Sequence, residues 1–141
     1  MSPDRLDLAI PSDVGQIERV VDAVVARCHA HRYPRRACAL NVPVALTEAL
    51  ANAIVSGNRE DAGKRVHVCA SIDDRQLVLE VRDEGPGFDL GAHAWGPDAA
   101  DAHDREDGRG LFLMRRLMDH VEQFVAPGSG NVVRMTLRRS A

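Results

Sequence analysis

A carboxylate and a carboxamide four residues apart, Glu48 and Asn52, are the side chains of this sequence best suited to chemistry. In a helix this spacing places both on one face, one turn apart. An amide oxygen suits Mg²⁺, which commonly takes only one or two protein ligands beside phosphate oxygens. A carboxylate one turn away would then lie where a general base acts in phosphoryl transfer. A plain solvent-facing polar stripe has the same spacing, so the pair alone leaves both interpretations open.

A second segment combines an aspartate with two glycines. Asp83, Gly85 and Gly87 follow a stretch of alternating apolar residues that is typical of a strand. A carboxylate fixed at the end of a strand can accept a hydrogen bond from an exocyclic amine such as that of adenine. The glycines allow the backbone to approach a ligand closely. An ordinary acidic turn is the alternative interpretation of this segment.

A third segment consists of Gly108, Arg109, Gly110 and Leu111, and it is predicted to open a helix that runs from Gly110 to Met118. Backbone N–H groups at the start of a helix, together with the positive end of its dipole, favour an anion such as phosphate. A flexible loop that merely caps the helix is the alternative. The order of the three segments along the chain favours the interpretation as a nucleotide site.

The hydrophobic pattern predicts the elements that must position these segments. Alternation predicts strands, and apolar residues at spacings of three and four predict helices. The predicted elements are a strand at 5–10, helices at 14–31, 42–56 and 110–118, and hairpins formed by 66–72 with 77–81 and by 120–125 with 132–137. Asn41 is predicted to cap the second helix, with Pro43 in its first turn. This order predicts an α+β fold with helices on one face of a mixed, mostly antiparallel sheet.

Two further features concern the surroundings of the three segments. Residues 89–107 show no sustained period, and a long irregular segment inside a small domain is typical of a functional lid or of disorder. Thr136 lies on the last predicted strand, where it is either a surface residue or is turned inward toward a ligand.

Composition narrows the class of protein. The 141 residues are enough for one domain with a hydrophobic core, and 45% hydrophobic with 28% charged residues is ordinary for a soluble protein. A net charge of -3 gives no general reason to expect nucleic-acid or membrane binding, and no segment is predicted to span a bilayer. The first residues do not resemble a signal peptide. Three cysteines without Cys-x-x-Cys spacing favour a reducing cytoplasm.

Taken together and in this order, the three segments resemble the conserved boxes of the GHKL superfamily of ATPases. Glu48 and Asn52 resemble its N box, the segment at Asp83 its first glycine box, and the segment at Gly108 its second. The sequence is most similar to the anti-sigma factor serine kinases, which carry Thr-Glu-Ala-x-x-Asn-Ala-x-x-x-Gly in the N box, as at 47–57. The resemblance implies a Bergerat-type two-layer sandwich: a single histidine-kinase-like ATPase domain over residues 1–141, with an ATP lid at about 89–107.

The resemblance also implies roles for the residues of the N box, with ATP and Mg²⁺ as cofactors. Asn52 would coordinate Mg²⁺, and Glu48 would be the catalytic base that takes the proton from a serine hydroxyl. Ser56 stands where many relatives carry histidine before the glycine. Its hydroxyl keeps a hydrogen-bonding group near the nucleotide, but the imidazole is lost.

The remaining site residues are implied to bind ATP. Asp83 would accept a hydrogen bond from the adenine amine, with Thr136 supporting it on the last strands. Gly85 and Gly87 would be the hinges of the lid. The phosphates would be cradled by the second glycine box, formed by Gly108, Arg109, Gly110 and Leu111.

The function implied by the resemblance is that of an anti-sigma factor in a partner-switching system. Such a protein is a homodimer that sequesters a sigma factor and phosphorylates a serine of a STAS-type anti-anti-sigma protein. Two alternatives remain open. One, favoured by Ser56 and the unmatched lid, is a catalytically weak nucleotide-dependent binding switch. The other is a detached ATP-binding domain of a histidine kinase, although only one predicted helix precedes the N box.

Overall fold

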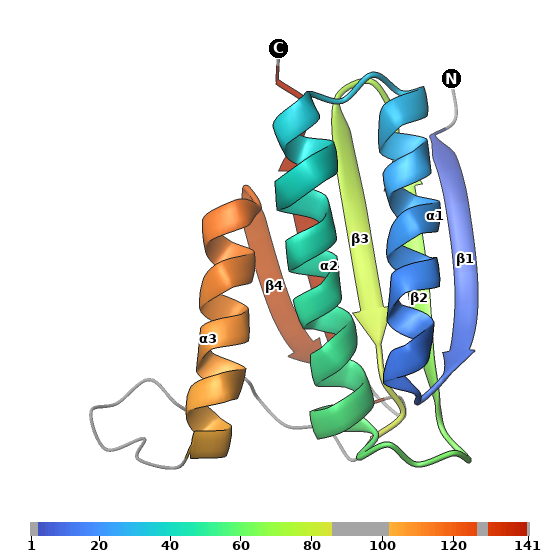
Figure 1. Cartoon of the computed structure of the whole chain (residues 1–141), viewed down its shortest axis with the longest axis vertical. Coiled ribbons are helices and arrows are strands. Elements are labelled where there is room, and N and C mark those ends of the chain that lie inside the picture. Colours follow the sequence, from blue (N-terminus) through green and yellow to red (C-terminus); the bar gives the residue numbers. More distant parts are fainter. Residues whose placement is uncertain (1–2, 86–101, 127–129, 141) are drawn as a thin grey trace.

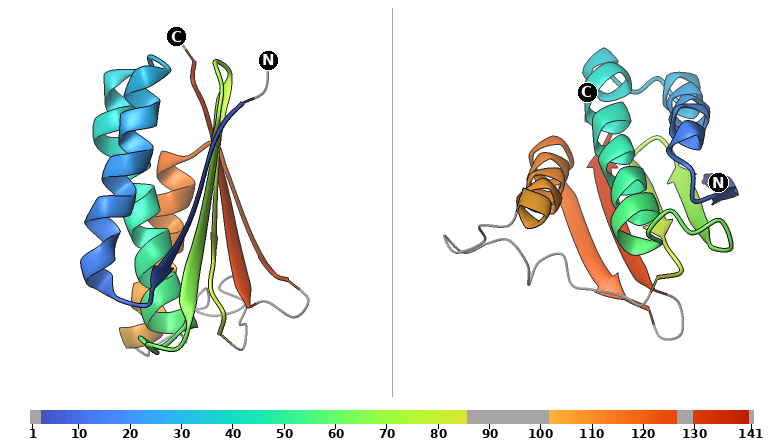
Figure 2. Two further views of the ribbon diagram at one scale, coloured as in Figure 1. Left: turned by 90° about the vertical axis from the view of Figure 1, so that its right-hand side faces the viewer. Right: turned by 60° about the horizontal axis from the view of Figure 1, so that its bottom comes forward.

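The computed structural model describes residues 3–85, 102–126 and 130–140, with the backbone alone over 102–109. Its described elements form two layers, a five-stranded antiparallel sheet in the order β1-β2-β3-β5-β4 and helices on one face of it (Figure 1) (Figure 2). In chain order the elements are β1 (Asp4–Pro11), η1 (Val14–Gln16), α1 (Ile17–Ala30), η2 (Ala37–Asn41), α2 (Val42–Ala51), η3 (Asn52–Gly57), β2 (Arg65–Ile72), β3 (Gln76–Arg82), α3 (Ala102–Leu117), β4 (His120–Val125) and β5 (Asn131–Arg138). The predicted two-layer α+β fold is confirmed.

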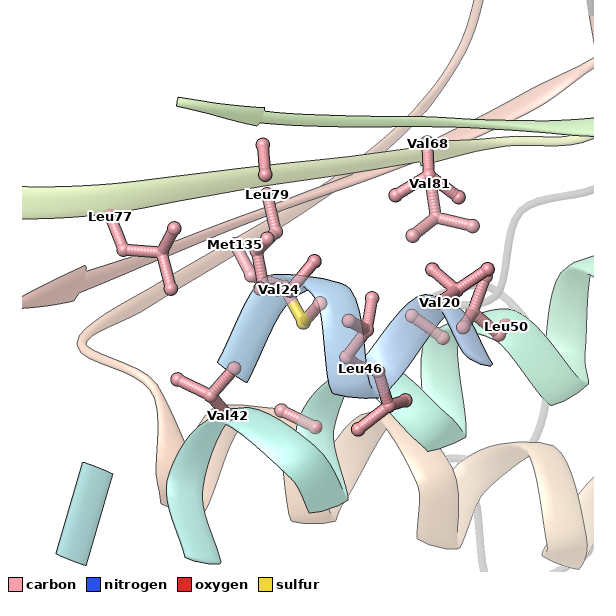
Figure 3. Close-up of a cluster of buried hydrophobic side chains, with 14 of the residues drawn as sticks. Val20, Val24, Val42, Leu46, Leu50, Val68, Leu77, Leu79, Val81 and Met135 are labelled. Carbon is pink, nitrogen blue, oxygen red and sulfur yellow. The ribbon is translucent and has the colours of Figure 1, made fainter. Parts of the chain in front are cut away.

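The alternating segments form the sheet as predicted. Residues of β2 and β3 alternate between buried and partly exposed positions, and the antiparallel register sets Ala70 opposite Leu79. Figure 3 shows the inward-facing side chains of the sheet meeting those of α1 and α2. Leu46 and Leu50 of α2 and Val24 of α1 are completely buried there. The period-two pattern therefore gives one face of the sheet to the core, as expected for a sheet covered on one side.

The opposite face of the sheet is lined by polar and charged side chains. Arg134 of β5 forms ion pairs with Glu80 of β3 at 3.1 Å and with Glu122 of β4 at 3.4 Å. The same guanidinium lies 5.2 Å from the centre of the Phe124 ring. Positions of β5 that share the parity of Arg134, including Thr136, belong to this face because side chains alternate along a strand.

The helix that carries the N box is longer than the sequence predicts. It begins at Ala37 rather than at residue 42, and it continues through α2 and η3 to Gly57. Asn41 has helical dihedral angles and makes no capping bond from its side chain, so its prediction as the N-cap is wrong. The wider π-helical turn η2 precedes Pro43, which lacks an N–H group and would crowd a regular turn.

This helix also corrects the prediction that no segment is apolar enough to span a membrane. The 21 residues from Ala37 to Gly57 have the length and composition of a membrane span. The apolar side chains of this helix nevertheless pack in the core of the domain, where Val42, Leu46 and Ile54 have no exposed surface. The helix is accordingly the central core helix of the fold, in which a high hydropathy follows from burial.

The third helix differs most from the prediction. Residues 102–107, assigned above to the irregular lid, are helical, so the second glycine segment lies inside α3 and does not open it. The buried side chains of Leu111 and Met114 anchor the second half of the helix. Their burial favours the helix, whereas each glycine in a helix interior disfavours it by about 1 kcal/mol.

Candidate functional site

The polar face of the N-box helix lies against the second glycine segment. A methyl group on Gly110 would lie 3.1 Å from Glu48 Oε2 and 3.2 Å from Asn52 Nδ2, so this glycine packs directly on both side chains. At the other end of the helix pair, Asn41 Nδ2 donates to the carbonyl oxygen of Leu117 at 2.6 Å and caps the end of α3. The structure therefore brings the carboxylate and the carboxamide together and adds the glycine segment to them.

The carboxamide of Asn52 has an unsatisfied polar atom. Its Nδ2 is buried and has no hydrogen-bond partner within the described part of the chain. Nearly all buried polar atoms in folded proteins are paired, so such an atom calls for a ligand or an ordered water. The side chain borders a cavity of about 10 Å³ that is also lined by Asp83, roughly the space of one water molecule. The N box and the first glycine segment thus border one small cavity, whose remaining walls include Ala49, Val81 and Val133.

The donor set at this cavity fits a magnesium–nucleotide complex. A carboxamide turned about its last bond presents an oxygen, which is a suitable ligand for a hard cation that keeps most of its coordination for phosphate and water. Thiolate and imidazole, which favour softer metals, are not among the residues that line the cavity. Among the described residues that line the cavity, Asn52 and Asp83 therefore offer oxygen donors that suit Mg²⁺.

Asp83 follows the last residue of β3 and is held by backbone groups. It is only 3% exposed, and its Oδ1 accepts hydrogen bonds from the N–H groups of Gly85 and Asn131, both at 3.0 Å. Its own N–H donates to the carbonyl oxygen of Asn131 at 3.0 Å. Burial raises the pKa of the Asp83 carboxyl, and the hydrogen bonds from Asn131 and Gly85 oppose that rise. Both of these backbone hydrogen bonds reach Oδ1, and Oδ2 lies on the side of Gly57.

Three glycines surround this carboxylate because no larger residue fits. A methyl group on Gly57 would lie 2.0 Å from Asp83 Oδ2, and one on Gly85 would lie 1.9 Å from the carbonyl oxygen of Gly57. Gly130 has a positive φ of 56°, and a methyl group there would lie 2.4 Å from Asp83 Oδ1. Close packing around Asp83 is therefore a reason for glycine at each of these three positions.

Two predicted site residues lie elsewhere. Thr136 is five residues beyond Asn131 on β5, about 17 Å along the strand, and it belongs to the open face of the sheet. Its implied support of Asp83 is therefore wrong. Of the two orientations left open by the sequence, the surface one holds, because strand alternation gives the inward position to Met135. The Leu111 side chain is completely buried in the hydrophobic core, so any contact with a ligand would come from its backbone.

The other predicted residues are placed only in part. Ser56 is half-buried in η3, one helical turn beyond Asn52. Gly108 and Arg109 belong to α3, where only their backbone is described, and Gly87 lies outside the described residues.

Sequence reasoning missed Asn131. The residue pairs with Asp83 through both its N–H and its C=O, although the two positions are 48 residues apart. The glycine that precedes it, Gly130, is the only local signal, since it marks a tight backbone next to the last strand.

Comparison with known proteins identifies the family of the chain. A family model described as a histidine kinase-like ATPase domain matches residues 10–137. The chain is 36% identical over 96 residues to the anti-sigma F factor of Clostridium acetobutylicum, which covers 67% of this chain and 66% of that protein. It is 31% identical to the anti-sigma F factor of Thermoanaerobacter pseudethanolicus and 27% identical to that of Bacillus subtilis, with 86% and 89% of this chain and 85% and 86% of those proteins covered.

Solved structures share the fold. The RsbU and RsbW domains of a Mycobacterium tuberculosis protein match with a TM-score of 0.67 at 15% identity, over 98% of this chain and 33% of that one. The mycobacterial sensor histidine kinase MprB matches with a TM-score of 0.54 at 16% identity, over 96% and 97%. On the family model and the sequence relatives, the chain belongs to the histidine kinase-like ATPase family, in the group whose members include the anti-sigma F factors.

Proposed function

We propose that this protein is an anti-sigma factor and an ATP-dependent protein serine kinase. The observation that carries the proposal is the convergence of Glu48, Asn52 and Gly110, with Asp83 across the adjoining cavity. Three segments that are far apart in the sequence thereby meet at one polar site. The names of the sequence relatives support the regulatory half of the proposal, because they are anti-sigma F factors.

Each of the three segments would contribute residues to ATP binding. Asp83 would accept the adenine amine at Oδ2, and Asn52 would hold Mg²⁺, which when bound neutralises charge on the phosphates. Ser56 would add a hydroxyl near the nucleotide, and Gly85 and Gly87 would let the lid close. The phosphates would be bound by the second glycine box, with Gly108, Arg109, Gly110 and the Leu111 backbone.

A cavity of about 10 Å³ is far too small for a purine, so binding requires the site to widen. Gly110 is the contact between α3 and the N box, and two glycines make this part of α3 the least costly to unwind. We propose that the backbone around Gly110 leaves its helical position when phosphate binds. Its N–H groups, which are otherwise bonded within the helix, would then become available to the anion.

Glu48 would act as the general base in the transfer. Its carboxylate lies beside the carboxamide that holds the metal, which is where a proton acceptor for the attacking serine hydroxyl is needed. The partners that follow from the resemblance are a sigma factor, a STAS-type anti-anti-sigma protein and a second copy of this chain. All of them would be met in the cytoplasm, without direct contact to nucleic acid or membrane.

The kinase half is tested with labelled ATP, Mg²⁺ and a cognate STAS-type protein. Wild type is expected to phosphorylate a serine, and Glu48→Ala is expected to slow this about 100-fold or more while ATP affinity changes little. Asn52→Ala should instead lose Mg²⁺-dependent ATP binding. Glu60→Ala, the same change at an exposed glutamate, is the control. Bound nucleotide without any serine phosphorylation would exclude the kinase.

A second candidate is a nucleotide-dependent binding switch with little catalysis. The small cavity and the helical second glycine segment favour it, because both are unfavourable for rapid turnover. In that case Glu48→Ala would leave sigma-factor binding and its release fully intact. Loss of release in this variant, with binding retained, would exclude the switch and support the kinase.

A further inference from the structure

A buried carboxamide next to the N box joins four segments of the chain. Asn58 directly follows Gly57 and is 1% exposed. Its Oδ1 accepts the Glu84 N–H at 2.7 Å, and its Nδ2 donates to Ser12 Oγ and to the Arg65 carbonyl oxygen, both at 2.9 Å. The side chain therefore connects the end of η3 to the segments that follow β1 and β3 and to the start of β2.

The partners of Asn58 leave only one orientation for its amide. Both amide hydrogens and the amide oxygen are used, and the Glu84 N–H is a donor while the Arg65 carbonyl is an acceptor. A flipped amide would set donor against donor and acceptor against acceptor. Ser12 strengthens the arrangement, because its hydroxyl donates to the Lys64 carbonyl oxygen at 2.7 Å. The network is thus complete on all sides, as buried polar networks must be to be stable.

Asn58 acts on the residue next to Asp83. The peptide groups on both sides of the Asp83 Cα are anchored, since the Asp83 N–H donates to Asn131 and the Glu84 N–H donates to Asn58. The Glu84 carboxylate adds a third anchor, which accepts the Arg65 N–H at 3.1 Å. With both peptide planes held, the direction in which the Asp83 side chain leaves the backbone is determined.

We propose that Asn58 is a positioning residue for nucleobase recognition. Through the Glu84 N–H it holds Asp83 Oδ2 at the angle needed to accept an exocyclic amine, without touching the nucleotide itself. Because Asn58 lies six residues beyond Asn52 in the same helical segment and its cap, it also couples the N box to Asp83. The inference rests on the proposed function, in which Asp83 reads the adenine amine.

The readout is the ratio of affinities for ATP and inosine triphosphate, measured by calorimetry in the presence of Mg²⁺. Inosine triphosphate carries a carbonyl oxygen in place of the amine and a hydrogen on N1, so the ratio reports recognition of this edge of the base, which the proposed function assigns to Asp83. Wild type is expected to prefer ATP by roughly tenfold to a hundredfold, the value of one hydrogen bond to a buried charge. If wild type binds ATP without this preference, or binds neither nucleotide, the proposed adenine-binding role of Asp83 is wrong. That outcome contradicts the proposed function, independently of any result with Asn58 variants.

Asn58→Ala is expected to lower the ratio of ATP affinity to inosine triphosphate affinity about tenfold or more, so that it approaches one. This effect is separate from any loss of thermal stability in the variant. Tyr33→Phe is the matched control, because it removes one buried hydrogen bond, from the Tyr33 hydroxyl to the Asp73 carbonyl oxygen, at the far end of the sheet. Its ratio should equal that of wild type. An unchanged ratio in Asn58→Ala would overturn the proposal and leave Asn58 as a structural residue.

Asn58→Asp tests the same bond if the alanine variant does not fold. The aspartate keeps the acceptor for the Glu84 N–H and loses both donors. Its ratio is expected to stay within about threefold of wild type even though its melting temperature falls. A ratio near one in this variant would overturn the assignment to the Glu84 bond.

Discussion

Gly57 offers the sharpest test of the packing around Asp83. A methyl group there would lie 2.0 Å from Asp83 Oδ2 and 2.5 Å from its Cγ, whereas non-bonded heavy atoms pack at about 3.5 Å or more. Gly57→Ala therefore forces the carboxylate to move by more than about 1 Å. Such a movement disrupts the hydrogen bonds that Oδ1 accepts from Gly85 and Asn131.

The magnitude follows from two unfavourable contributions and one favourable one. Overpacking costs about 1–3 kcal/mol, and weakening two hydrogen bonds to a buried carboxylate costs about 1.5 kcal/mol or more. Replacing glycine by alanine at the end of a helix returns at most about 1 kcal/mol. The expected net loss is about 3 kcal/mol. In a chain of this length that loss corresponds to a fall in melting temperature of roughly 6–12 °C.

Thermal unfolding followed by circular dichroism and ATP binding followed by calorimetry check this prediction together. Gly63→Ala is the control, because a methyl group on this exposed glycine would lie 3.3 Å from the Asp61 Oδ1, and its stability should change by less than about 0.5 kcal/mol. If Gly57→Ala melts within about 2 °C of wild type and binds ATP equally well, the close packing of Gly57 on Asp83 is wrong.

Three other changes are expected to have distinct effects. Gly110→Ala should leave the free energy of unfolding unchanged or raise it by up to about 1 kcal/mol, because the ends of the neighbouring side chains can shift. The same change should weaken ATP binding, because it stiffens α3. Equal ATP affinity in the variant and in wild type would argue against unwinding at Gly110. Asp83→Asn should raise the melting temperature at pH values above the raised pKa of Asp83, where the wild type must bury a charged carboxylate. That difference should shrink as pH falls through the raised pKa of Asp83, because protonation then stabilises the wild-type fold; a constant difference across acidic pH would contradict the role of burial. In timed alkylation followed by mass spectrometry, half-buried Cys69 should react before the buried Cys28. Burial raises the pKa of the Cys28 thiol to about 12, which leaves little reactive thiolate. Equal alkylation rates would contradict the burial of Cys28.

Much of the fold could be predicted because it depends on local periodicity. The alternation in β2 and β3 and the spacing of Leu46 and Leu50 each report a buried face directly. The beginning of the central helix could not, since Pro43 is typical of a first turn and only the wider turn η2 shows that the helix continues before it. The glycines of the third segment likewise indicate a break, although buried Leu111 in fact anchors the helix just beyond them.

The candidate site divides in the same way. The spacing of Glu48 and Asn52 is a local helical property, so their common face could be predicted. The support of Asp83 could not, because Asn131 is 48 residues away and Asn58 lies 26 residues from Glu84. Contacts of that kind arise only when strands and helix ends meet in three dimensions, and no periodic pattern in the sequence records them.

Several features that oppose folding meet at one place. Asp83 buries a carboxylate, Asn52 buries an amide nitrogen without a partner in the described chain, and Gly130 takes a positive φ. Gly110 occupies the interior of α3, where alanine would be more stable by about 1 kcal/mol. Away from the site, the described strands and the helices α1 and α2 follow the ordinary rules of pattern and burial, and the positive φ angles of non-glycine residues such as Arg32 and Arg59 fall in connecting segments. Departures from those rules are expected where function requires them. Their convergence on the cavity between Asn52 and Asp83 thus supports the same site by an energetic argument that does not depend on resemblance.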